Sequence, residues 1–153
     1  MDNVWAELEK KFRSMHLSLR EGILFLVLYF YMIDRRNEDE APYINKTKVQ
    51  KVMCLLWLLH GLNLKYVFRL FINGPFSEAL QEDIERLRNK GFLRKQELCE
   101  NFVRYYLIED KIEALERKIL PVVKKEEKIL KKLRKIGKYS KESTKRLEKI
   151  ATE

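Results

Sequence analysis

The stretch Asn73-Gly74-Pro75-Phe76-Ser77, followed by an amphipathic segment that Gly91 closes, decides how the middle of this chain folds. Pro75 fixes its own φ and disfavours the α conformation for Gly74, so the chain turns there. Ser77 is a good N-cap residue, and a helix is predicted over 78–90. Gly91 supplies the left-handed cap that ends this helix, and an apolar strand is expected to resume at 92–93.

The charges of the predicted 78–90 helix follow its dipole, with acidic residues near its start and basic residues near its end. Glu82 and Arg86 are spaced to form an i,i+4 pair. Leu80, Ile84 and Leu87 recur at helical spacing and mark the buried face. Every local signal in this segment therefore favours a helix.

A second helix is predicted over 46–60, between the N-cap Asn45 and the terminator Gly61. Three lysines, Lys46, Lys48 and Lys51, crowd its first turns, where the dipole disfavours cations. They form either an anion site or a solvated basic face. The apolar stripe expected to be buried comprises Val49, Val52, Met53, Leu56 and Leu59.

The remaining pattern predicts further elements on both sides of these helices. Helices are expected over 2–15 and 18–33, the second beginning with a capping box of Ser18 and Glu21. A loop is predicted over 34–43, a short strand at 43–44 and a longer, partly buried strand over 66–72. From about Gln96 onward the pattern is read as helical.

An apolar stripe with heptad-like spacing runs through the C-terminal part of the chain, with Pro121 inside it. We predict a long kinked helix, or two helices nearly in line, ending at Gly137, and a last short helix after Ser140. The stripe either forms a coiled coil between subunits, which makes a homodimer, or packs back on the domain. The residues of the candidate oligomer interface are Ile112, Leu115, Ile119, Ile129, Leu133 and Ile136.

The length and charge of the chain suit a small domain with a helical appendage. Its 153 residues carry a net charge of +9, but residues 1–110 hold 17 basic and 16 acidic side chains, whereas residues 111–153 hold 15 and 7. We expect a domain at 1–95 and a basic helical extension at 96–153. Such an extension binds nucleic acid or an anionic membrane surface, or keeps a helix soluble.

Cysteine usage and hydropathy favour a cytoplasmic protein. Cys54 and Cys99 are isolated in the sequence, so no disulfide framework is expected. The apolar run 23–33 is too short to span a bilayer and lacks the features of a signal peptide, and no membrane association is predicted.

No catalytic or metal-binding constellation is found in the sequence, so an enzyme, a metal and a cofactor are not expected. His16 and His60 are the only histidines, and neither has metal-ligand spacing to a Cys, Asp or Glu. Adjacent acidic pairs lie on different helix faces. The aromatic residues are interpreted as core, including Trp57 and Phe71.

The segments Lys48-Val49-Gln50-Lys51 and Gly74-Pro75-Phe76-Ser77, separated by a strand that ends at Ile72, resemble the SocA-like antitoxin (Panacea) family and its YwgA-like relatives. Leu147-Glu148-Lys149-Ile150-Ala151 is similar to the terminal helix of that family. The resemblance implies a predominantly helical α+β fold: a winged helix-turn-helix-like domain, here with a long C-terminal helical extension. It also implies structural roles for the motif residues Gln50, Gly74, Pro75 and Ser77.

Two functions follow from the resemblance and the charge pattern. The first is a non-enzymatic transcriptional regulator that binds the phosphate backbone of double-stranded DNA. The second is an antitoxin-like module that binds a protein partner and no DNA. Because the 78–90 helix begins with acidic residues, the DNA surface is placed elsewhere, on Lys46, Lys48, Lys51, Lys124, Lys125, Lys128, Lys131, Lys132 and Lys135.

Overall fold

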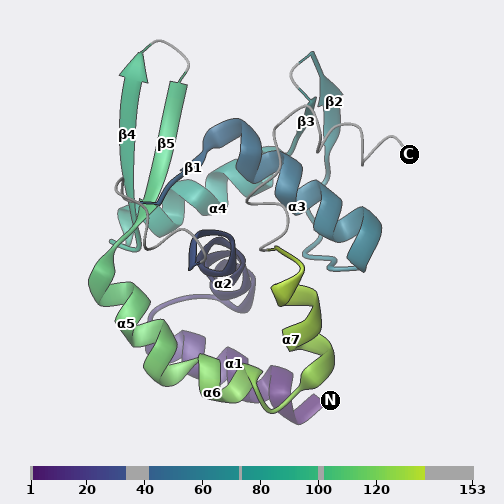
Figure 1. Cartoon of the computed structure of the whole chain (residues 1–153), viewed down its shortest axis with the longest axis vertical. Helices are drawn as coiled ribbons and strands as arrows, with labels where there is room; N and C mark the ends of the chain where they lie inside the picture. The colour runs from purple at the N-terminus through teal and green to yellow at the C-terminus, as the bar shows by residue number, and fades with distance from the viewer. Residues whose placement is uncertain (1, 34–41, 73, 100–101, 137–153) are drawn as a thin grey trace.

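The structure, a computed structural model, shows a predominantly helical α+β protein and describes residues 2–33, 42–72, 74–99 and 102–136 (Figure 1). The helices are α1 (Asp2–Ser14), α2 (Leu19–Ile33), α3 (Lys46–His60), α4 (Glu78–Asn89), α5 (Glu109–Lys118), α6 (Leu120–Val123) and α7 (Glu127–Arg134). The strands are β1 (Ile44–Asn45), β2 (Arg69–Phe71), β3 (Gly74–Phe76), β4 (Leu93–Cys99) and β5 (Phe102–Leu107).

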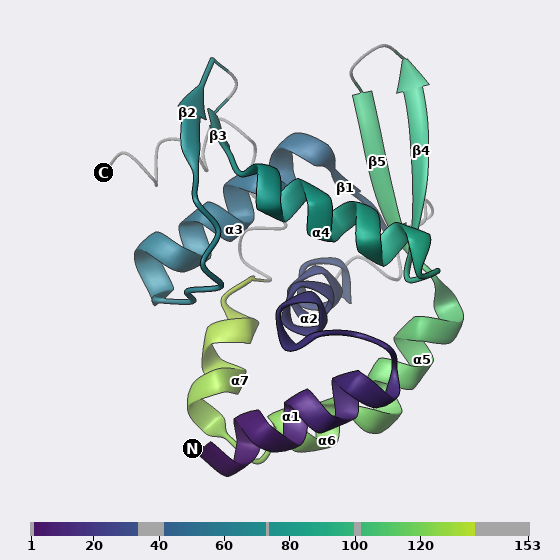
Figure 2. The same cartoon turned by 180° about the vertical axis from the view of Figure 1, so that it is seen from behind.

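Helix α2 forms the centre of the molecule. Figures 1 and 2 show it between a layer of α3 and α4 and a layer of α1, α5 and α6. Leu24, Phe25 and Val27 are completely buried, as expected for a helix that is apolar on nearly every side. The predicted capping box is confirmed: the Ser18 amide donates to Glu21 Oε1 (2.8 Å) and the Glu21 amide donates to Ser18 Oγ (3.1 Å).

The strands form two small antiparallel sheets. In the larger one the order is β1-β5-β4, with Ile44 opposite Tyr105 and Leu93 opposite Leu107. The β4–β5 hairpin extends from the helical body as a two-stranded arm (Figure 1). The smaller sheet is the β2–β3 hairpin, in which Arg69 faces Phe76. Gly74 and Pro75 lie in β3 and pair with Phe71 and Leu70, and Ser77 alone separates this strand from α4.

The prediction of a helix from Gln96 onward is wrong. Residues 93–99 and 102–107 form β4 and β5, and β4 crosses the domain boundary expected between 95 and 96. Tyr105 and Tyr106 match a helical spacing with earlier apolar residues, but they are also aromatic residues that favour strands. The strand is stabilised by hairpin pairing of β5 with β4 and, on its other side, by pairing with β1, which lies far away in the sequence.

The C-terminal apolar stripe packs on the domain, which is the second of the two predicted alternatives, and its buried residues do not form a coiled-coil face. Its residues contribute to the single core that surrounds α2. The segment is broken into three helices, because Pro121 lies in the first turn of α6 and the chain turns again before α7. Of the six candidate interface residues, Ile129 is partly buried and the others are buried: Ile112, Leu115, Ile119, Leu133 and Ile136.

Of the remaining predictions, some are confirmed and others concern residues that the structure does not describe. The caps at Asn45 and Ser77 and the left-handed conformations of Gly61 and Gly91 are confirmed. The predicted turn at 73, the end at Gly137 and the last helix after Ser140 involve residues outside the described ranges. No single helix in the described part of the chain is long and apolar enough to cross a membrane, and only the bent α1–α2 pair together reaches that size.

Candidate functional site

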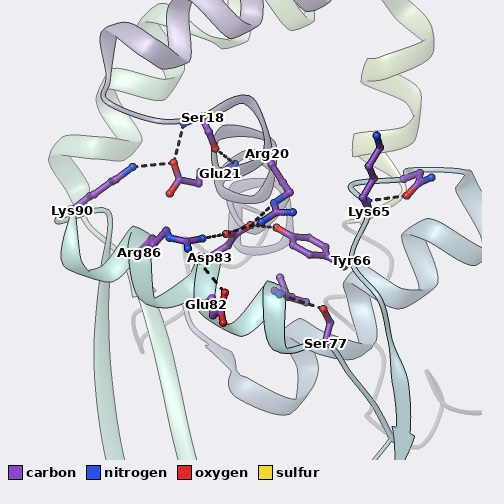
Figure 3. Close-up of polar contacts among 12 residues, drawn as sticks. Ser18, Arg20, Glu21, Lys65, Tyr66, Ser77, Glu82, Asp83, Arg86 and Lys90 are labelled. Carbon is purple, nitrogen blue, oxygen red and sulfur yellow. Dashed lines mark hydrogen bonds and ion pairs between the residues drawn. The ribbon is translucent and has the colours of Figure 1, made fainter.

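A buried carboxylate, that of Asp83 on α4, joins three parts of the fold (Figure 3). Arg20 Nε on α2 donates to its Oδ2 at 2.7 Å, and Arg86 Nη1 donates to its Oδ1 at 2.7 Å. The hydroxyl of Tyr66, which precedes β2, donates to Oδ2 at 2.7 Å. Asp83 is 1% exposed, so these donors replace the water that the carboxylate loses on folding.

The protonation state of Tyr66 suits a hydrogen-bond donor to Asp83. Burial, together with the hydrogen bond to the Asp83 carboxylate, raises the pKa of Tyr66 far above its usual range. The hydroxyl therefore keeps its proton and remains a donor. Arg20 also lies over the Tyr66 ring, with 5.0 Å between the guanidinium carbon and the ring centroid. These contacts hold α4 and the segment before β2 against α2, and the group of Arg20, Tyr66, Asp83 and Arg86 is here called a clasp.

A second clasp joins the start of α2 to the end of α4. Lys90 Nζ donates to Glu21 Oε1 (2.9 Å) and to the His16 carbonyl (2.9 Å). Burial acts to raise the pKa of Glu21, but the hydrogen bonds from the Ser18 amide and from Lys90 outweigh it, and the pKa is lowered overall. Glu21 thus favours the folded state in its charged form.

We expect Glu21→Gln to flatten the acid side of the stability profile. The folded pKa of Glu21 lies below its unfolded value of about 4.3, so its contribution is complete above that value and disappears as pH falls through the folded pKa. Urea unfolding at pH 7 and pH 3 measures this. The difference in unfolding free energy between wild type and variant should be larger at pH 7, and an equal difference at both values would contradict the prediction.

The motif residues Gln50 and Ser77 meet in the core. Gln50 Nε2 donates to the Ser77 carbonyl (3.1 Å), and the Ser77 amide donates to Gln50 Oε1 (2.7 Å). Ser77 Oγ accepts from the Leu80 amide and caps α4. The predicted contact of Gln50 with the turn backbone is confirmed, and Gly74, at φ 112°, and Pro75 form the strand that leads into this turn.

The lysines at the start of α3 have different environments. Lys46 is exposed, and Lys48 Nζ lies 5.5 Å from the centroid of the Tyr31 ring. Lys51 is 3% exposed and belongs to the buried side of α3. The expectation that Lys51 lies on an anion-binding surface is therefore wrong, because its helix position faces the interior.

The six C-terminal lysines of the predicted DNA surface lie apart from those of α3. All six are exposed: Lys124, Lys125, Lys128, Lys131, Lys132 and Lys135. Lys125 pairs with Glu7 of α1 at 3.2 Å. Helix α7 lies near the C-terminal end of α3, whereas Lys46 is the first residue of α3, at the opposite end of that helix (Figure 1). At 1.5 Å per residue, the two ends of α3 are roughly 20 Å apart, so the nine lysines do not form one surface.

An exposed apolar surface, here called the apolar platform, covers the end of α3 and the β2–β3 hairpin. Leu70 is 88% exposed and Ile72 is fully exposed. The Phe68 and Trp57 rings stack with centroids 6.2 Å apart, which connects the two elements. The platform consists of the exposed residues Trp57, Leu58, Leu59, Val67, Leu70, Phe71 and Ile72.

The platform corrects three expectations from the sequence. Trp57, Leu59 and Phe71 were predicted to be core, but each is exposed. Helical and strand periodicity identify apolar faces, and they do not tell whether another element covers them. The apolar run 67–72, interrupted only by Arg69, could have indicated this exposure. Successive residues of a strand point to opposite faces, so a hairpin with one buried face cannot bury the whole run.

Comparison with known protein families and with curated proteins finds no match to this chain. In the described ranges, no cluster of three or more His, Cys, Asp or Glu side chains is arranged to hold a metal ion. The two clasps, the Gln50–Ser77 contact and the apolar platform are thus the features on which a functional interpretation rests.

Proposed function

We propose that this chain is a winged-helix-like module that binds a partner protein through the apolar platform. The observation that carries the proposal is the exposure of Leu70, Phe71 and Ile72 on the β2–β3 hairpin together with that of Trp57 near the end of α3. Water disfavours exposed apolar surface by about 25 cal/mol per Å². Monomeric proteins rarely expose a large contiguous apolar patch, and such patches mark interaction sites.

The order of elements supports the winged-helix-like part of the proposal. A helix, a short strand, two helices and a hairpin follow one another as α2, β1, α3, α4 and β4–β5, and the short strand pairs with the second hairpin strand. This is the arrangement that the resemblance to the SocA-like family implies. The β2–β3 hairpin is inserted between α3 and α4, and it carries Leu70, Phe71 and Ile72 of the platform.

The charges of α4 favour a protein partner over insertion into a DNA groove. In the winged-helix arrangement, α4 takes the position of the recognition helix. Its exposed side begins with Glu78 and includes Glu82, which repel phosphates. Arg86 is paired with Asp83 and Arg88 with Glu85, so the arginines of this helix are already engaged with acids.

The partner that fits the platform is an extended segment rich in aliphatic side chains. Among the described residues, β2 pairs with β3 on one side only, and the sheet they form has two strands. No described strand pairs with the other edge of β2, and its backbone groups can accept a further strand. An added strand would gain backbone hydrogen bonds from this edge, while its side chains would cover Leu70 and neighbouring residues.

The test compares wild type with Leu70→Asp/Ile72→Asp. Proteins retained by immobilised wild type and lost with the variant are identified, purified and titrated against both forms by calorimetry. Because two central apolar contacts are replaced by charges, the affinity of the true partner should fall by roughly 100-fold. Light scattering of the chain alone shows whether the partner is a second copy.

The matched control is Glu82→Lys/Lys124→Asp, two exposed positions outside the platform. Circular dichroism should be the same for all three proteins, since the altered side chains are exposed. A purified partner that binds the platform variant as tightly as wild type would overturn the proposal.

A second candidate function is binding of the DNA backbone by α6, α7 and the turn between them. The observation that favours it is the group of six exposed lysines in this region. Backbone binding requires cationic side chains and no groove-reading helix, so the acidic start of α4 does not oppose it.

If these six lysines neutralise about six phosphates, the slope of log K against log salt concentration is expected to be near −5. Fluorescence anisotropy with a random duplex measures the slope. Lys131→Glu/Lys132→Glu should weaken binding strongly, whereas Lys46→Glu, roughly 20 Å away along α3, should have a smaller effect. A flat salt response would exclude this candidate.

A further inference from the structure

A cavity of about 820 Å³ lies between α1, α2, the end of α3 with the loop that follows it, and α7. Its inner wall is apolar, formed by side chains from each of these parts. The partly exposed apolar residues of this wall are Trp5, Leu19, Leu62, Leu64 and Ile129, and behind them the side chains of Leu8, Leu26 and Ile136 are buried. The volume lies within the range of cavities that hold small organic ligands, about 300–1,000 Å³.

The mouth of the cavity is cationic. The cavity lining includes Lys128, Lys131 and Lys132 of α7, Lys135 just after it and Lys65 of the loop after α3, and all five are exposed. No acidic side chain is among the described residues that line the cavity. An incoming anion therefore meets several ammonium groups and no carboxylate that would neutralise them.

Lys65 has an uncommon backbone conformation that places it at this mouth. Its φ is 63°, in the left-handed region that residues other than glycine adopt rarely. Its amide donates to Asn63 Oδ1 (2.8 Å), which holds the turn. Figure 3 shows the Lys65 side chain extending toward α7, so both sides of the mouth contribute a cation.

Arg20 does not serve as a headgroup ligand, although it also lines the cavity. Its guanidinium is engaged by the Asp83 carboxylate, with contacts of 2.7 and 3.3 Å. The lysines at the mouth are consequently the groups that remain to select the charge of a ligand.

We propose that this cavity binds a single-chain amphipathic anion of the fatty-acid type. The alkyl chain occupies the apolar interior, and the carboxylate lies among the lysines at the mouth. An uncharged chain would leave the cations unpaired, and a fully polar anion would leave the apolar wall in contact with water. Both halves of the site therefore favour the same class of ligand.

Trp5 lines the cavity and provides a direct reporter. In the Trp57→Phe background it is the remaining tryptophan, since the chain contains two. Titration with cis-parinaric acid, a fluorescent fatty acid, should show saturable energy transfer from Trp5 with one site per chain. Dodecanoate should displace the probe, and dodecanol should do so much more weakly. Each pair of added methylenes in the competitor should raise its affinity roughly tenfold until the cavity is full.

Two variants separate the headgroup from the chain. Lys131→Glu/Lys135→Glu should weaken probe binding at least about tenfold, as expected for the loss of cations near a carboxylate. The matched control, Lys124→Glu/Arg134→Glu, changes the net charge equally but lies outside the cavity wall, and it should bind as wild type does. Ile129→Phe, at a partly buried position of the wall, should reduce chain binding while every lysine is retained.

Equal displacement by dodecanoate and dodecanol, equal weakening in the control, or the absence of saturable binding would each overturn the proposal. Leu70→Asp/Ile72→Asp removes the apolar platform and should leave probe binding unchanged. Loss of binding in that variant would place the probe on the platform instead. The fatty-acid titration uses neither a protein partner nor DNA. Its result is therefore independent of the two proposed functions.

Discussion

Asp83→Ala is expected to lower the free energy of unfolding by about 3 kcal/mol. The variant leaves the hydroxyl of Tyr66 buried without its acceptor, which alone costs about 1–3 kcal/mol. Arg20 and Arg86 lose their ion pairs, but their side chains are 39% and 52% exposed, so water compensates much of that loss. The expected loss in free energy of unfolding therefore lies at the lower end of the range of about 3–5 kcal/mol for a broken buried ion pair.

Urea denaturation measures this loss, and thermal unfolding should show a decrease of roughly 6–12 °C in Tm. Glu82→Ala is the matched control, because Glu82 is the exposed neighbour and lies 4.0 Å from Arg86. Its effect should stay within about 0.5 kcal/mol. Equal destabilisation by the two substitutions would show that burial of Asp83 contributes nothing.

A double-mutant cycle identifies the hydroxyl of Tyr66 as part of the clasp. Tyr66→Phe in the wild type removes a donor from the buried carboxylate and should destabilise the protein. The same change in the Asp83→Ala background should cost less, because the hydroxyl there has already lost its acceptor. Additive effects would separate Tyr66 from the clasp.

Gly22→Ala is expected to destabilise the protein by about 1–3 kcal/mol, although the change normally favours a helix by about 1 kcal/mol. A Cβ at Gly22 of α2 would overlap the aromatic ring of Phe12 on α1. Phe12 is completely buried, so the ring has no free space to move into. The cost of separating α1 from α2 should exceed the gain in helix propensity.

A smaller side chain at position 12 should remove the overlap between the Cβ at position 22 and the Phe12 ring, and this provides the control. Phe12→Leu alone should lower stability, since it removes buried apolar volume. In the Phe12→Leu background, Gly22→Ala should be much less harmful than in the wild type, and the coupling should exceed about 1 kcal/mol. Stabilisation by Gly22→Ala in the wild type would show that the two helices approach less closely than the structure shows.

The helix boundaries could be predicted because their causes are local. Ser18 with Glu21, Asn45 with Lys48, and Ser77 with Leu80 each satisfy backbone amides within three residues, and the distances bear this out. Gly91 ends its helix through a φ that other residues avoid. Such interactions depend on residue type and short spacing, which are both present in the sequence.

The features of the candidate site were harder to predict because they depend on distant neighbours. Asp83 reads as an ordinary acid near a helix start, and it is buried only because Arg20 and Tyr66 are brought to it. Lys51 occupies a helix face that turns inward, whereas Trp57, although its ring stacks on Phe68, remains 42% exposed. Periodicity shows which residues share a face and does not show what lies opposite.

By itself, then, the sequence determined the caps and the central apolar helix, because each results from interactions within a few residues or from composition. Only the tertiary structure showed that 102–107 is a strand of a three-stranded sheet, since β5 pairs with β4 on one side and with the distant β1, at 44–45, on the other. The tertiary structure also decided that the C-terminal stripe is core and that the run 67–72 is a surface. Burial of an apolar face requires a second face, and the chain brings the two together only when it folds.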